Sequence, residues 1–306
     1  MIITSRDNPN VKRIAKLTKR DNARSEGVIY LEGTRLCEEA LASGQTPVEV
    51  IVSEDRLNWA KDFTPEIEPL VLNKDVFKKI SQTVNPQGVA LIIKEPSISS
   101  DIPRKADGKD IYVVLENTQD PGNLGTMIRT ADAFGLTAVI VSPTTCDPYN
   151  DKVIRATMGS VWHIPVVRKT MDECFEFFDK ENIDTLAMHL KGNELGAGDL
   201  KLPCAYFIGN EGDGLTDETT KKCKRLVKIP MKGKAESLNA AVAASLAAQE
   251  GASEEDQLDE SAITDEPKWY VAHTYSGYEN KVKINIEKTI ENRHLENQIF
   301  EVRVTM

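Results

Sequence analysis

The sequence predicts an α/β protein with two domains, a small N-terminal α/β unit and a larger domain built on a parallel sheet. Residues 110–249 alternate short apolar strands with helices, which is typical of a parallel α/β domain. Residues 1–95 also mix strands and helices, and residues 96–109, rich in Ser, Pro, Asp and Lys, indicate a linker between the two. A chain of 306 residues is long for one domain and suits two.

The N-terminal unit begins with an amphipathic helix predicted over Asn8–Arg20. Its apolar face is formed by Val11, Ile14, Ala15 and Leu17. The elements expected after it are strands at Val28–Leu31, Val48–Val52 and Val89–Ile93, and helices at Thr34–Ala42 and Asp75–Ile80. Residues 1–30 carry seven Lys or Arg against three Asp or Glu, which favours contact with RNA phosphates. A solvated helix face would have the same charge, so both interpretations stay open.

The second domain starts on the continuous apolar segment IYVVLEN, which predicts a strand covered on both faces of a parallel sheet. The polar loop TQDPGNLG leads into a helix, TMIRTADAF, that stops at Gly135, and the strand AVIVS follows. Further strands are expected at Ile164–Val167, Thr185–Met188, Ala205–Ile208 and Leu226–Ile229, and helices at Lys152–Met158, Met171–Lys180 and Leu238–Ala248.

Residues 250–306 are predicted to form a disordered acidic stretch followed by a short segment with few helices and strands. Residues 250–266 hold eight Asp or Glu, no Lys or Arg and no aromatic residue, which predicts a disordered linker. They account for most of the net charge of −10, so the rest of the chain is near neutral. Residues 267–306 predict two strands and one helix, too little to bury a stable core alone.

The composition argues against a membrane protein, a secreted protein and a protein held by disulfides or a metal. No apolar run approaches the roughly 20 residues that cross a bilayer, and the segment MIITSRDNPNVKR lacks the apolar core of a signal peptide. The five cysteines form no CxxC pair, which favours reduced thiols over disulfides or a metal site. We therefore expect a cytoplasmic protein with no membrane partner and no bound metal.

Three segments of the second domain carry candidate chemistry. The first, Asn117–Ala131, joins a strand end to a helix start, where backbone N–H groups attract anions, and it places Arg129 in the second turn of the helix, beside the loop. A Pro-Gly turn followed by a solvent-facing arginine is the alternative. The second, Phe207–Thr216, has three glycines after an apolar strand, at the strand end where open α/β sheets bind ligands. A flexible surface loop is its alternative.

The third segment, Ile229–Asn239, runs into an alanine-rich helix. Ser237 is a candidate N-cap for that helix. A capped core helix explains the alanines well, but it explains the polar residues Glu236, Ser237 and Asn239 less well.

In order and spacing, these segments resemble the three motifs of the SpoU (TrmH-like) branch of the SPOUT methyltransferase superfamily. Tyr30–Arg35 and Pro86–Gly88 resemble the substrate-binding domain that precedes the catalytic domain in this family. The resemblance covers residues 1–249. It implies a homodimeric RNA methyltransferase that transfers a methyl group from S-adenosylmethionine to a ribose 2′-hydroxyl, and a catalytic domain ending in a trefoil knot. Ribosomal RNA is favoured over transfer RNA as the substrate. A catalytically silent RNA-binding module is the other alternative.

The resemblance also implies the site residues. Those matching the cofactor pocket are Gly209, Ile229, Met231 and Leu238. Those matching polar groups around the reacting ribose and its phosphate are Asn123, Glu211, Ser237 and Asn239. Arg129 matches the arginine that acts on the 2′-hydroxyl, either as a base or as an orienting group.

The final segment has a resemblance of its own. Residues 267–306 resemble the opening of the transcription elongation factor NusG, truncated after the first strand, helix and next strand. A gene fusion, a frameshift or a gene-calling accident explains this truncation better than a working contact with RNA polymerase.

Overall fold

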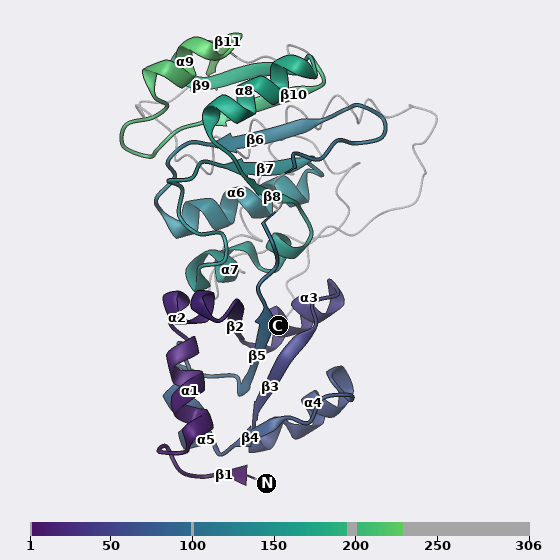
Figure 1. The fold of residues 1–306 in the computed structure, drawn as a ribbon, viewed down its shortest axis with the longest axis vertical. Helices are drawn as coiled ribbons and strands as arrows, with labels where there is room; N and C mark the ends of the chain where they lie inside the picture. Colours follow the sequence, from purple (N-terminus) through teal and green to yellow (C-terminus); the bar gives the residue numbers. More distant parts are fainter. Residues whose placement is uncertain (1, 99–100, 195–200, 229–306) are drawn as a thin grey trace, which may run out of the picture. The chain divides into compact units, whose positions relative to one another are not determined.

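The computed structural model describes residues 2–98, 101–194 and 201–228, and within them the chain builds two β-sheets with flanking helices (Figure 1). All of these residues belong to one unit that spans residues 1–257. Among the described residues, no helix is both long enough and apolar enough to cross a membrane. The expected helix Leu238–Ala248, the expected knot and the expected NusG-like segment fall outside the described residues.

The first sheet has five strands in the order β1-β4-β3-β5-β2. Strand β5 runs antiparallel to both β2 and β3, and β4 runs parallel to β3. The strands are β1 Ile2–Ile3, β2 Val28–Glu32, β3 Pro47–Ser53, β4 Leu70–Leu72 and β5 Val89–Lys94. The helices are α1 Pro9–Leu17, α2 Arg20–Ser25, α3 Thr34–Ala42, α4 Leu57–Phe63 and α5 Lys74–Ile80. The three strands and two later helices expected in this region are thus confirmed to within one or two residues.

The first helix is shorter than the sequence predicts. Val11, Ile14 and Leu17 are buried on one face of α1, as expected. The helix ends at Leu17 because the Thr18 hydroxyl donates to the Ala15 carbonyl and Lys19 adopts an extended backbone, after which α2 begins. Basic residues therefore lie on two short helices instead of one long one.

The second sheet has six strands, all parallel, in the order β11-β9-β10-β6-β7-β8. The strands are β6 Ile111–Leu115, β7 Ala138–Val141, β8 Val166–Arg168, β9 Asp184–Glu194, β10 Cys204–Ile208 and β11 Arg225–Lys228. The helices are α6 Pro121–Ala133, α7 Asp151–Thr157, α8 Met171–Lys180 and α9 Asp217–Lys222. The predicted parallel α/β domain is therefore confirmed.

Strand β6 is buried on both faces, as its continuous apolar sequence predicts. Tyr112 and Val114 lie in one core cluster with Phe178 of α8. Val113 and Leu115, on the opposite face, lie in the other cluster with apolar residues of α6. Strand β6 thus packs against helices on both faces of the sheet. These two helical layers hold its carboxyl end in place.

Helix α6 begins five residues before the start that the sequence predicts. The Asp120 side chain caps it by accepting from the Asn123 backbone at 2.8 Å, and Pro121 occupies the first helical position. Arg129 consequently lies in the third turn, roughly 12 Å along the axis from Pro121, and not in the second turn. The expectation that Arg129 lies in the second turn of this helix is therefore wrong.

Candidate active site

Two loops leave the same edge of the parallel sheet and form the candidate site. Strands β6 and β10 are parallel neighbours, and Ile208 pairs with Leu115 at their carboxyl ends. The loop 116–120 follows β6, and the loop 209–216 follows β10. Because carboxyl ends of neighbouring parallel strands meet at one edge, the first and second sequence motifs come together there.

The first loop is held from behind by the segment after β7. Asn117 adopts a left-handed backbone (φ 59°), a conformation in which asparagine is enriched. Its backbone N–H donates to the Ser142 hydroxyl at 3.0 Å, and the Gln119 side chain donates to the Thr144 carbonyl at 2.7 Å. The Cys146 N–H donates to the Thr118 carbonyl at 2.9 Å. These bonds fix the approach to the start of α6.

The second loop is a tight turn closed by its own backbone. The N–H groups of Asn210 and Gly214 donate to each other's carbonyls at 3.0 and 2.9 Å. The Asn210 side chain accepts from the Gly212 N–H at 2.8 Å and donates to the Asn117 carbonyl at 2.8 Å. Gly214 has a φ of 71°, which favours glycine. Asn210 therefore links the second loop to the first.

Gly209 is required by the turn itself. A Cβ at this position would lie 2.0 Å from the Gly214 carbonyl carbon and 2.1 Å from the Leu215 nitrogen, both backbone atoms. Only glycine allows the turn to close this tightly. The need for glycine here therefore has a reason within the loop, independent of any ligand.

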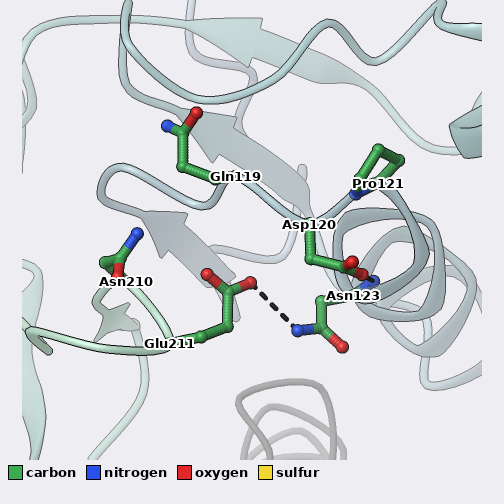
Figure 2. A pocket seen from close by; sticks show the side chains of 6 residues that line it. All are labelled: Gln119, Asp120, Pro121, Asn123, Asn210 and Glu211. Atoms are coloured by element: carbon green, nitrogen blue, oxygen red, sulfur yellow. Dashed lines mark hydrogen bonds between the residues drawn. The ribbon is translucent and has the colours of Figure 1, made fainter.

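A shallow cavity of about 660 Å³, wide open to solvent, lies between the two loops (Figure 2). Its lining residues are Gln119, Asp120, Pro121, Asn123, Asn210 and Glu211. The Asn123 side chain donates to the Glu211 carboxylate at 3.0 Å, so residues from both motifs meet in this cavity. The lining residues that the structure describes include two carboxylates, those of Asp120 and Glu211.

The electrostatics of the site extend to a neighbouring thiol. Burial, together with the charges of Glu211 and Asp120, raises the pKa of the partly buried Cys146 thiol to about 11. All five cysteines of the chain are free thiols in the structure. The site is therefore electronegative before any ligand binds.

The structure brings some predicted site residues together and leaves others apart. Asn123 and Glu211 line the cavity, and Gly209 begins the second loop. Arg129 is exposed on α6 and does not line the cavity, and its side chain makes no hydrogen bond or ion pair with other residues that the structure describes. The predicted site residues that lie outside the described part of the chain are Ile229, Met231, Ser237, Leu238 and Asn239.

Four residues of the site were not named as site residues from the sequence, although Asn117, Thr118 and Asn210 lie within the segments predicted to carry chemistry. Asn117 and Asn210 connect the loops, and Glu116 holds the end of the second loop by accepting from Thr216 and Thr219. Thr118 is fully buried, and its hydroxyl finds no partner in the part of the chain that the structure describes. The available signal was their position, since polar residues directly after a buried strand lie at the ligand-binding edge of a sheet.

Comparison with known proteins identifies the family. Residues 110–249 match the SpoU rRNA Methylase family, and residues 8–91 match the MRM3-like substrate binding domain. The chain is 34% identical over 248 residues to the 23S rRNA (guanosine(2553)-2′-O)-methyltransferase RlmP of Bacillus subtilis, a match that covers 80% of this chain and 96% of RlmP. The expected substrate-binding domain at the N-terminus is thereby confirmed.

Solved structures of RNA methyltransferases support the same family. A crystal structure of an RNA 2′-O ribose methyltransferase superimposes with a TM-score of 0.73 at 30% identity, covering 83% of this chain and 99% of that one. The AdoMet-bound rRNA methyltransferase from Sinorhizobium meliloti gives a TM-score of 0.71 at 32% identity, covering 83% and 98% of the two chains. The chain therefore belongs to the SpoU family of RNA 2′-O-methyltransferases, enzymes that use S-adenosylmethionine.

Proposed function

We propose that this enzyme transfers the methyl group of S-adenosylmethionine to a ribose 2′-hydroxyl of ribosomal RNA. The observation that carries the proposal is the meeting of Asn123 and Glu211, one from each motif, beside a cavity at the carboxyl edge of the parallel sheet. The similarity to RlmP, which methylates 23S rRNA, supports ribosomal RNA as the substrate. Other relatives are named tRNA/rRNA methyltransferases, so transfer RNA is the second candidate.

The residues present fit the cofactor. The cavity volume of about 660 Å³ lies within the roughly 300–1,000 Å³ usual for small-molecule sites. The buried Thr118 hydroxyl, which has no partner in the described part of the chain, retains hydrogen-bonding capacity within the first loop. When bound, the cofactor supplies a methyl group on a sulfonium centre with a good leaving group. The residues proposed to hold it are Gly209, Ile229, Met231 and Leu238.

The protein's part in the reaction is positioning and handling of one proton. The ribose O2′–CH₃ bond forms as the methyl–sulfur bond breaks, and the hydroxyl proton passes to an acceptor. Arginine has a pKa above about 12, so it is a poor base at neutral pH. We therefore assign Arg129 to orient a phosphate or stabilise the developing alkoxide. The remaining polar contacts to the ribose and its phosphate are assigned to Asn123, Glu211, Ser237 and Asn239.

The quaternary and domain organisation completes the proposal. We assign the substrate-binding domain to residues 1–95, the linker to 96–109 and the catalytic domain, with its trefoil knot, to 110–249. The enzyme acts as a cytoplasmic homodimer, which light scattering at micromolar concentration tests, since it should give twice the chain mass of 34.0 kDa. We assign residues 250–266 to an acidic linker and 267–306 to a NusG-like segment, a stretch that neither family match reaches.

Mapping of 2′-O-methylation across total RNA, with and without the gene, tests the function directly. We expect one ribosomal position to lose its methyl group in the deletion strain. In vitro, purified enzyme with S-adenosylmethionine should methylate that RNA and not DNA of the same sequence, because DNA lacks the 2′-hydroxyl. Loss of a methyl group from transfer RNA alone would favour the second candidate, and an unchanged map would contradict the proposal.

A further inference from the structure

Glu116 is a buried carboxylate directly behind the candidate site. It follows the last residue of β6, and only 4% of it is exposed. Its backbone N–H donates to the Ile208 carbonyl at 2.9 Å, which continues the pairing of β6 with β10. A buried carboxylate is costly unless hydrogen bonds replace its water, so its partners indicate what it is there to hold.

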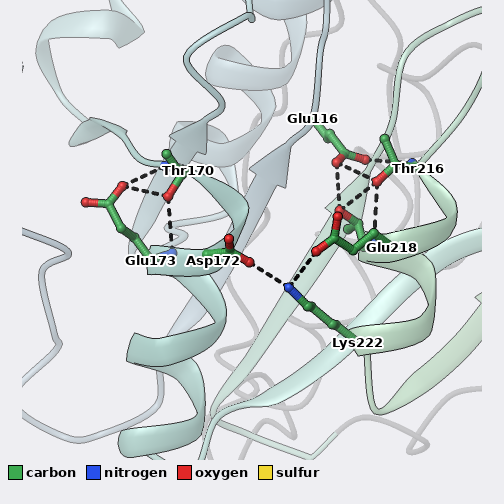
Figure 3. Close-up of polar contacts among 8 residues, drawn as sticks. Glu116, Thr170, Asp172, Glu173, Thr216, Glu218 and Lys222 are labelled. Atoms are coloured by element: carbon green, nitrogen blue, oxygen red, sulfur yellow. Dashed lines mark hydrogen bonds and ion pairs between the residues drawn. The ribbon is translucent and has the colours of Figure 1, made fainter.

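Among the described residues, the donors to this carboxylate come from Thr216, which ends the second loop, and from α9 directly after it (Figure 3). The Thr216 N–H donates at 2.8 Å and the Thr216 hydroxyl at 2.9 Å, while the buried Thr219 hydroxyl donates at 2.6 Å. Thr216 is also the N-cap of α9. The carboxylate therefore ties the exit of the loop and the start of α9 to the end of β6.

The neighbouring residue holds the other side of the same loop. The Asn117 carbonyl accepts from the Asn210 side chain at 2.8 Å. Two consecutive residues after β6, Glu116 and Asn117, are thus hydrogen-bonded to the second loop at Thr216 and Asn210. Glu211 lies between these two attachment points in the sequence. Glu116 itself does not line the cavity, so it acts on the site only through the loop.

We propose that Glu116 is a positioning residue that sets where Glu211 stands relative to Asn123 during methyl transfer. The inference rests on the proposed function for its catalytic consequence, but the fixing of the loop is measurable without any cofactor. A misplacement of about 1 Å in a catalytic group costs up to ~100-fold in rate, so a modest loosening of the loop is enough to lower turnover.

The experiment removes one hydroxyl donor at a time. Thr219→Val deletes the donor while keeping the size of the side chain, and Thr219→Ser restores the hydroxyl. Thr170→Val is the control, because the Thr170 hydroxyl also donates to a carboxylate, that of Glu173, but within a local cap at the exposed N-terminus of α8 (Figure 3). Glu116→Gln tests the carboxylate itself.

Two readouts are compared, amide hydrogen exchange of residues 209–216 without cofactor, and kcat and KM with RNA. We expect Thr219→Val and Glu116→Gln to exchange faster in this loop and to lose roughly tenfold in kcat, with KM for RNA changed less than about twofold. Thr219→Ser should recover most of the rate. Thr170→Val should change neither readout.

Several results would overturn the inference. Unchanged loop exchange in both Thr219→Val and Glu116→Gln would mean that the carboxylate does not fix the loop. Faster exchange with unchanged kcat would mean that the loop position does not matter for the reaction, and an equal loss in Thr170→Val would make the effect general destabilisation. If the unaltered enzyme methylates no RNA, the proposed function fails, and loop exchange alone then decides whether Glu116 fixes the loop.

Discussion

Asn123 and Glu211 lie 88 positions apart in sequence, yet the Asn123 amide donates to the Glu211 carboxylate at 3.0 Å. Asn123 is the third residue of α6, and Glu211 is in the turn after β10. The bond exists because β6 and β10 are parallel neighbours whose following loops share one edge. It is the point at which two separate sequence motifs become one site.

Replacement of either partner should impair methyl transfer. We expect Asn123→Ala and Glu211→Gln each to lower kcat on the order of 100-fold, the usual cost of removing one polar contact to a developing charge. Affinity for S-adenosylmethionine, measured by calorimetry, should stay within a few-fold. Glu218→Gln is the control, since Glu218 is an exposed carboxylate that pairs with Lys222 and does not line the cavity. Full activity in Glu211→Gln would exclude Glu211 from the chemistry.

Arg129 should be essential for turnover although it stands apart from the cavity. Its exposure, and its lack of partners among the described residues, leave the guanidinium available to RNA. We expect Arg129→Ala to lose at least about 100-fold in kcat with cofactor affinity unchanged within a few-fold. Arg129→Lys should not restore the rate, because a lysine cannot reproduce the planar fork. Lys180→Ala, which removes an exposed charge at the end of α8, is the control. Undiminished turnover in Arg129→Ala would refute the assignment.

Gly209 and Gly212 lie in the same loop, but only Gly209 has no room for a side chain, so alanine substitutions at the two positions can be compared. A Cβ at position 209 would overlap the backbone of Gly214 and Leu215, whereas at position 212 the nearest atom is the Asn210 side-chain oxygen at 3.4 Å. We expect Gly209→Ala to lower the stability by about 1–3 kcal/mol and to abolish cofactor binding. Gly212→Ala should stay within about 0.5 kcal/mol. Thermal melts and calorimetry of both variants make the comparison, and equal melting temperatures would contradict the geometry.

Helices and strands could be predicted from the sequence where their pattern of apolar residues is long enough to recognise. The apolar run of β6 and the amphipathic face of α1 gave correct elements because burial requires those residues. β4 has only three residues and α9 is almost entirely polar, so neither carries a period and neither was expected. The start of α6 was misplaced because the Asp120 cap and the Pro121 start were taken for loop.

Only some residues of the candidate site could be predicted, because contacts between distant parts of the chain leave no local pattern in the sequence. Asn123 and Glu211 were found through a resemblance to family motifs, and no local pattern predicts that they touch. The contact depends on the order of strands, which a single sequence does not reveal. Glu116 and Asn210 were missed because their role is to hold another loop, and their partners are distant in sequence.

The Cys146 thiol offers a pH-dependent probe of the site. Burial and the nearby carboxylates raise its pKa from 9.0 to about 11, so little thiolate exists at pH 8. We expect iodoacetamide to alkylate Cys146 slowly below pH 9, with a rate that rises through pH 11, and Glu211→Gln should move the midpoint to lower pH. Mass spectrometry locates the label, and Cys146→Ser identifies its peptide. A midpoint at or below 9 would contradict the burial of the thiol, and an unchanged midpoint in Glu211→Gln would show that this carboxylate does not act on it.

Residues 251–306 should be dispensable for methyl transfer. The SpoU match ends at residue 249, and the stretch 250–266 that follows has eight acids, no Lys or Arg and no aromatic residue. The negative charge of this stretch should repel phosphate and slow RNA association at low salt. A chain ending at Glu250 should therefore keep its turnover and melting temperature and bind RNA equally well or slightly more tightly at low salt. Methylation rate, thermal melts and RNA affinity of the two chains make the comparison, and a loss of activity or stability on truncation would show that the segment is an integral part of the enzyme.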